Sequence, residues 1–204
     1  MHNRRIGVLI SGRGSNLQAI IDSIADGSLD ATVTVVISNK TNAAGLECAK
    51  QAGIETLHLD HKNYESRQAF DFAVVDELKR REVELVCLAG FMRLLSADFV
   101  KAFPNRILNI HPSLLPSFPG LDGQAQAWEY GVKVSGATVH IVTPELDAGP
   151  IVRQAVVRVE DVDTPETLAA RILVEEHKIY PQAIGVMLAG GWRVEGRRFV
   201  EHQR

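Results

Sequence analysis

The segment IGVLISGRGSN, residues 6–16, decides the fold. It begins with an apolar run rich in β-branched side chains, and a turn of Ser, Gly and Arg residues leads into an amphipathic stretch at residues 16–25. A short apolar run followed by a longer stretch with helical spacing predicts a strand, a tight turn and a helix. This order is the first half of a βαβ unit.

The same rhythm continues through the first half of the chain, which favours βαβ units and a parallel sheet. The runs at residues 85–88 and 106–110 lack strict alternation, as expected for central strands that are covered by helices on both faces. We therefore predict an α/β fold, a Rossmann-like, open, mostly parallel twisted sheet with helices on both faces. The predicted strands are 6–10, 33–37, 55–59, 85–88 and 106–110, and the predicted helices are 16–25, 43–52 and 66–81.

Beyond residue 111 the alternation of strands and helices gives way to a loop rich in Pro and Gly. No internal repeat or linker interrupts the chain, so residues 1–204 are predicted to form a single domain. The predicted elements are a short helix at 124–130, two paired strands at 137–142 and 151–159, a helix from Pro165 to about residue 188, and a hairpin at 192–200.

Composition narrows the classes of function. Hydrophobic residues make up 46% and charged residues 23% of the 204 residues, which is typical of folded soluble proteins. The net charge of −3 disfavours a nucleic acid partner. Two cysteines make a disulfide framework improbable, and neither a signal peptide pattern nor a membrane-length apolar stretch is found. We predict a cytoplasmic protein that does not bind membranes.

The turn at residues 11–16 is a candidate phosphate loop. It opens a helix, where free backbone N–H groups and the positive helix end favour an anion, and its glycines allow close approach. It lacks the spacing of a dinucleotide fingerprint and the Lys of a P-loop, which disfavours NAD and ATP. An ordinary strand-to-helix turn capped by Ser or Asn explains the pattern equally well.

A second motif ends the strand at 106–110. Asn109 and His111 are two residues apart, so both side chains point to one face at the carboxyl end, where open α/β sheets bind ligands. The amide and the imidazole suit a tetrahedral oxyanion, and without a nucleophile elbow direct transfer between bound substrates is favoured. Asp147, in a turn, could support His111. A strand-end histidine and a turn carboxylate that only satisfy nearby backbone groups are the alternatives.

Four segments together carry a resemblance. The string ILNIHPSLLP at 107–116 resembles the hallmark of folate-dependent formyltransferases, and the matching segments SGRGSN at 11–16, AGFMR at 89–93 and ELDAGP at 145–150 extend it. The resemblance covers nearly the whole chain. Within the family, the chain is most similar to the branch that formylates glycinamide ribonucleotide in purine synthesis.

The resemblance implies the reaction. An amine of glycinamide ribonucleotide attacks the formyl carbon of 10-formyltetrahydrofolate, Asn109 and His111 stabilise the oxyanion, and Asp147 supports proton transfer. No metal is implied, and the seven His and two Cys show no spacing typical of zinc ligands. A monomer and a homodimer both remain open.

The resemblance also implies binding residues, and it divides the domain into a phosphate and ribonucleotide half at about 1–105 and a catalytic and folate half at about 106–204. Residues implied for the ribonucleotide are Gly14, Ser15 and Asn16 for the phosphate and Glu176 for the ribose or glycinamide end, and those implied for the folate pterin are Met92, Arg93, Leu94, Leu95, Val142 and Pro144.

Three further expectations concern the second half. Residues 120–125 carry no histidine where some family members do, which leaves contacts there unassigned. His140 has the position of a family histidine and is interpreted as structural. The Leu115–Pro116 bond is a cis candidate by resemblance, although trans is the commoner state of X-Pro bonds.

Three alternatives remain. Methionyl-tRNA formyltransferase resembles this core but carries an added domain and basic surface, and formyltetrahydrofolate hydrolase shares the Asn, His and Asp set but usually bears an additional regulatory domain. A non-catalytic phosphate or nucleotide binding module is the alternative of a different class, because fold alone does not fix function.

Overall fold

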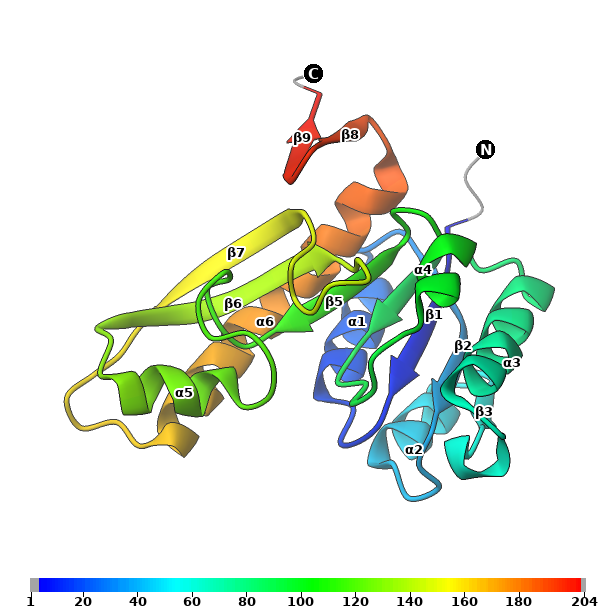
Figure 1. The fold of residues 1–204 in the computed structure, drawn as a ribbon, viewed down its shortest axis with the longest axis horizontal. Helices are drawn as coiled ribbons and strands as arrows, with labels where there is room; N and C mark the ends of the chain where they lie inside the picture. The colour runs from blue at the N-terminus through cyan, green and yellow to red at the C-terminus, as the bar shows by residue number, and fades with distance from the viewer. Residues whose placement is uncertain (1–3, 203–204) are drawn as a thin grey trace.

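The computed structural model describes residues 4–202, which form one nine-stranded sheet flanked by helices (Figure 1). The strand order is β3-β2-β1-β4-β5-β6-β7-β9-β8. The strands are β1 Arg5–Ile10, β2 Thr32–Ser38, β3 Thr56–His58, β4 Leu85–Leu88, β5 Ile107–His111, β6 Val134–Ile141, β7 Ile151–Arg158, β8 Trp192–Glu195 and β9 Arg198–Glu201.

The helices cover both faces of this sheet. One core cluster joins the sheet to α1, α2 and α6, and the other joins it to α3 and α4. Helix α6 lies on the same face of the sheet as α1 and α2 and crosses β5, β6 and β7 (Figure 1). The helices are α1 Ser15–Ala25, α2 Ala44–Gln51, η1 His61–Asn63, α3 Arg67–Arg80, α4 Ala97–Ala102, α5 Gly123–Tyr130 and α6 Pro165–Ala189.

The predicted α/β fold is confirmed. Strands β3, β2, β1, β4 and β5 are parallel, and β4 and β5 are central as expected. Strands β6 and β7 add to β5 as antiparallel neighbours, and β8 and β9 form the predicted hairpin. The sheet is therefore parallel from β3 to β5, antiparallel from β5 through β6 to β7, and parallel again between β7 and β9.

The differences from prediction are local. Helix α4 was not among the predicted elements, because its six residues are too few to show a helical period. Its signal is the N-cap residue Ser96, whose hydroxyl accepts a hydrogen bond from the Phe99 N–H. Strand β6 begins three residues before its predicted start. The Leu115–Pro116 peptide bond is cis, as the resemblance implies. Within residues 4–202, no helix has the length and apolarity to cross a membrane.

Candidate active site

Three loops meet at the carboxyl ends of the central parallel strands. Leu9 of β1 pairs with Leu88 of β4, which pairs with Asn109 of β5. The loops that follow these strands therefore leave the same edge of the sheet, where ligands bind in open α/β folds. They are the candidate phosphate loop, residues 89–96, and the segment after His111.

The candidate phosphate loop leads into an uncapped helix. The N-cap of α1 is Gly14 with φ 79°, and within the described residues no side chain caps it. The interpretation of a turn capped by Ser15 or Asn16 is therefore wrong. The first N–H groups of a helix lack intrahelical acceptors, so this end is open to an anion. Glycine is required at position 14, since an added Cβ would lie 2.5 Å from the Gly45 Cα.

Asn16 and Glu176 join two helices inside the site. The Asn16 Nδ2 donates a hydrogen bond of 2.7 Å to Glu176 Oε2, while Asn16 Oδ1 is buried without a described partner. Burial raises the pKa of Glu176, and the hydrogen bond from Asn16 opposes that shift in part. Asn16 and Glu176 thus both place polar side-chain atoms at the cleft. A role of either residue in ligand binding requires this placement.

A cleft of about 670 Å³ lies over this edge of the sheet. Arg13 and Lys40 give it cationic side chains beside the loop, and Glu166 and Glu176 give it carboxylates. This volume suits a small-molecule ligand. It is lined by Ser11, Gly12, Arg13, Gly14, Ser15, Asn16, Lys40, Ala89, Gly90, Met92, Ile110, Pro112, Gln124, Glu166, Ala169, Ala170, Leu173 and Glu176.

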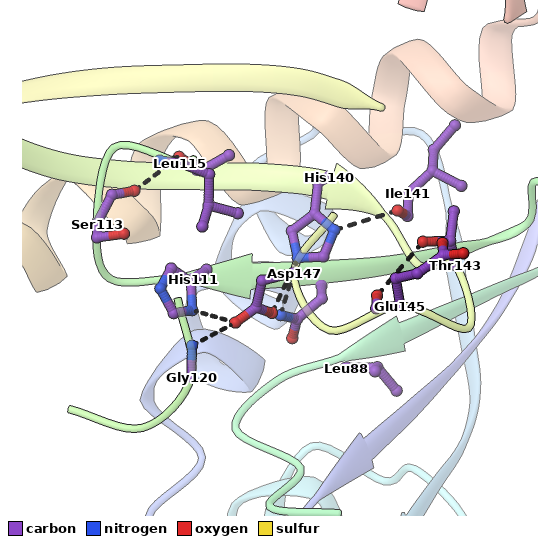
Figure 2. Close-up of polar contacts among 12 residues, drawn as sticks. Leu88, His111, Ser113, Leu115, Gly120, His140, Ile141, Thr143, Glu145 and Asp147 are labelled. Atoms are coloured by element: carbon purple, nitrogen blue, oxygen red, sulfur yellow. Dashed lines mark hydrogen bonds and ion pairs between the residues drawn. The ribbon is translucent and has the colours of Figure 1, made fainter. Parts of the chain in front are cut away.

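Asn109, His111 and Asp147 come together beside the cleft, although they are not among its lining residues. The lining residues Ile110 and Pro112 flank His111 in the chain. Figure 2 shows Asp147 between the rings of His111 and His140. The sequence alone could not place Asp147 there, and its proximity to His111 supports a joint role.

His111 has acceptors at both ring nitrogens. Its Nε2 lies 2.8 Å from the Phe118 carbonyl oxygen and therefore carries a hydrogen, and its Nδ1 lies 3.5 Å from Asp147 Oδ2. Burial lowers the pKa of His111, and the Phe118 carbonyl and the Asp147 charge oppose this shift in part. The lowered pKa favours the neutral ring, whereas the Phe118 carbonyl and the Asp147 carboxylate stabilise a second proton on it.

Asp147 is held as a carboxylate. Its Oδ2 accepts a hydrogen bond of 2.7 Å from the Gly120 N–H, and its Oδ1 lies 3.6 Å from His140 Nε2. Burial raises its pKa, but the contacts with His140, Gly120 and His111 outweigh burial, so the pKa lies below the usual value. Its φ of 47° is left-handed, a conformation that Asp tolerates in turns.

His140 connects the other members of the cluster. Its Nε2 lies 3.2 Å from Asn109 Nδ2 as well as near Asp147, and its Nδ1 lies 3.1 Å from the Ile141 carbonyl. The bond to the backbone fits the structural interpretation, but the ring also orients Asn109. The signal for this contact is the β5-β6 register, which places His140 opposite Asn109 and cannot be read from spacing alone.

Most of the residues expected around the pterin do not line this cleft. Met92 alone among them lines the cleft, and it is 62% exposed. Leu95 and Val142 pack against the core cluster of α3 and α4, and the Arg93 guanidinium lies 5.1 Å from the centre of the Phe70 ring. Leu94 and Pro144 are exposed.

Two residues with polar roles were missed. Ser11 is only 4% exposed, yet its hydroxyl bonds two other loops, and Gln124 lines the cleft in the segment that lacks family histidines. Ser11 was part of the recognised motif, but spacing did not indicate its partners. Within the described residues, no group of three or more His, Cys, Asp or Glu side chains could hold a metal ion.

Comparison with known proteins identifies the family of this chain. The family described as "Formyl transferase" matches residues 4–184. The chain therefore belongs to the formyl transferase family.

Individual relatives are closely similar. The crystal structure of glycinamide ribonucleotide transformylase 1 from Symbiobacterium toebii superposes with a TM-score of 0.97 at 55% identity, covering 99% of this chain and 95% of that one. Phosphoribosylglycinamide formyltransferase from Escherichia coli is 47% identical over 192 residues, 94% of this chain and 88% of that protein. The trifunctional purine biosynthetic protein adenosine-3 from Bos taurus is 49% identical over 190 residues, but the chain spans 19% of its length.

Proposed function

We propose that this chain transfers the formyl group of 10-formyltetrahydrofolate to the amine of glycinamide ribonucleotide, giving formylglycinamide ribonucleotide and tetrahydrofolate in de novo purine synthesis. The observation that carries the proposal is the cluster of Asn109, His111 and Asp147, which lies beside a cleft that begins at an uncapped helix end. Its relatives from Symbiobacterium toebii and Escherichia coli are named for this activity, and their similarity covers nearly the whole chain.

The phosphate end of the ribonucleotide binds at the start of α1. Backbone N–H groups of Gly14, Ser15 and Asn16 hold the phosphate, where the helix end favours negative charge. Glu176, oriented by Asn16, accepts hydrogen bonds from the ribose or glycinamide end. The cleft extends from this loop to Pro112, so the amine is directed toward the polar cluster.

The folate end binds along the two loops that carry Met92, Arg93, Leu94, Leu95, Val142 and Pro144. Exposed apolar side chains of Met92 and Leu94 suit a flat heterocycle, and the cofactor supplies the formyl carbon that the amine attacks. Met92 also lines the cleft proposed for the ribonucleotide, so its side chain contacts both substrates.

Asn109 and His111 stabilise the oxyanion that forms when the amine adds to the formyl group. Preorganised donors of this kind are among the largest contributions to acyl transfer rates. Asp147 favours the protonated state of His111, because its charge lies 3.5 Å from the ring nitrogen. His111 can then donate a proton to the folate nitrogen as its bond to the formyl carbon breaks and the intermediate collapses.

A spectrophotometric assay tests the proposal. Folate product is measured from 10-formyltetrahydrofolate with and without glycinamide ribonucleotide, with no metal added. Turnover that depends on the ribonucleotide is expected. Turnover without it would indicate the hydrolase, turnover with methionyl initiator tRNA in its place would indicate the tRNA enzyme, and no turnover with any acceptor would favour a binding module. A cytoplasmic location and a monomeric or homodimeric state stay predictions of the sequence.

A further inference from the structure

The loop of residues 89–96, between β4 and α4, is tied to the rest of the site near its start. The Met92 N–H donates a hydrogen bond of 2.9 Å to the Ser11 hydroxyl, and the Ser11 N–H donates to the Gly90 carbonyl. The Ser11 hydroxyl in turn donates a 2.6 Å hydrogen bond to Asn39 Oδ1. Ser11 and Asn39 are each 4% exposed, so a buried hydroxyl ties the phosphate loop to the 89–96 loop and to the residue after β2.

The far end of the loop is tied to α3. Asp71 is 2% exposed, and its Oδ2 accepts a hydrogen bond of 2.6 Å from the Ser96 N–H. Ser96 is also the N-cap of α4. Burying a carboxylate costs free energy unless hydrogen bonds satisfy it. The buried Asp71 therefore indicates that its hydrogen bond holds Ser96 in a required position.

Between these two ends the loop carries the side chains proposed to meet the folate. The Arg93 guanidinium lies over the Phe70 ring, next in the chain to Asp71, so α3 supports the middle of the loop as well as its end. Met92 lines the cleft near the start of the loop, whereas Leu94 and Leu95 do not line it.

We propose that Ser11 and Asp71 are positioning residues that fix the 89–96 loop at its two ends and thereby set the affinity for both substrates. This inference rests on the proposed function. Ser11 acts through Met92, whose side chain contacts both substrates. Asp71 acts on the end of the loop that only the folate contacts, through Ser96.

The two residues therefore predict different binding patterns. Ser11→Ala leaves the Met92 N–H and Asn39 Oδ1 without their buried partner, so the Kd values of both glycinamide ribonucleotide and tetrahydrofolate should rise by about tenfold. Asp71→Ala should raise the Kd of tetrahydrofolate by about tenfold and leave that of the ribonucleotide unchanged. Isothermal titration calorimetry with each compound alone gives both constants without turnover.

A conservative variant separates the hydrogen bond from the charge. Asp71→Asn retains a carbonyl oxygen that can accept from the Ser96 N–H, so it should keep the wild-type affinities. Ser66→Ala is the matched control on α3, because it removes a side-chain acceptor from the Ala69 N–H at the start of the same helix. It should lower the melting temperature without changing either Kd.

Several results would overturn the proposal. These are equal changes of both constants in Asp71→Ala, an effect of Ser11→Ala confined to the ribonucleotide, or Asp71→Asn behaving like Asp71→Ala. If Asp71→Ala does not fold, Asp71→Ser tests the same step, because its side chain is too short to reach the Ser96 N–H. Wild-type turnover is measured first, since its absence would contradict the proposed function, whereas the positioning roles are judged from the binding constants.

Discussion

Asn16 and Glu176, 160 residues apart in the chain, are joined by a 2.7 Å hydrogen bond inside the cleft. Asn16 belongs to the first turn of α1, and Glu176 lies in the middle of α6. The bond therefore joins a residue of the predicted ribonucleotide half to a residue of the predicted catalytic and folate half. A carboxylate held in this buried position costs stability, which supports the proposed binding role of Glu176.

Glu176→Gln should stabilise the protein at neutral pH and weaken ribonucleotide binding. Burial raises the pKa of Glu176 in the folded state, so stability is greatest below the unfolded value of 4.5 and is lost as pH rises through the raised value. Gln keeps an oxygen that accepts from Asn16 but has no charge to bury. The advantage of the variant in melting temperature should therefore grow from pH 4 to pH 8, as followed by circular dichroism.

Glu175→Gln is the control for this experiment, because Glu175 is a half-buried neighbour on the same helix that bonds only Lys178 among its described side-chain partners. Glu175 does not line the cleft, so Glu175→Gln should leave the affinity for glycinamide ribonucleotide at the wild-type value. A Glu176→Gln advantage that stays constant or shrinks with pH would contradict burial as the cause.

Asp147→Asn should lower the pKa of His111 further. Burial already lowers that pKa, and the charge of Asp147 raises it in part, so removal of the charge takes away an opposing effect. The titration of the His111 ring proton by NMR measures the change directly. Asp122→Asn is a matched control, because Asp122 is also an Asp with a left-handed backbone, with φ 54°. The charge of Asp122 is not among the causes of the His111 pKa shift, so the His111 titration should not change. An unchanged or raised His111 pKa in Asp147→Asn would exclude the coupling.

The sequence could predict whatever depends on local pattern. The turn before α1 follows from its glycines, and the shared face of Asn109 and His111 follows from the period of a strand. The contacts of His140 and Asp147 depend on the β5-β6 register and on the path of the turn that holds Asp147, neither of which is local. Burial of Ser11 and Asp71 likewise depends on neighbours far along the chain, so their partners appear only in the fold.

Asn109→Ala should lower kcat by about 100-fold or more, because its amide is proposed to meet the developing oxyanion. His111→Ala should also lose turnover, while the melting temperatures of both variants stay close to wild type. Asn63→Ala serves as the control, since Asn63 is an exposed residue of the short helix η1. Steady-state kinetics with both substrates checks the prediction, and near-normal kcat in Asn109→Ala together with His111→Ala would remove both from the proposed mechanism.

Gly14→Ala should impair the phosphate loop by more than its backbone conformation alone explains. Gly14 and Gly27 have nearly the same positive φ, 79° and 80°. A Cβ at position 27 would meet nothing within 4 Å, whereas at position 14 it would lie 2.5 Å from the Gly45 Cα. Gly27→Ala thus isolates the conformational cost, which is on the order of 1 kcal/mol in the free energy of unfolding. Gly14→Ala should cost more than that in urea unfolding and should also raise the KM for glycinamide ribonucleotide, because the loop must move away from Gly45. If the two variants lose equal stability and keep the same KM, the close approach of the two loops does not shape the phosphate site.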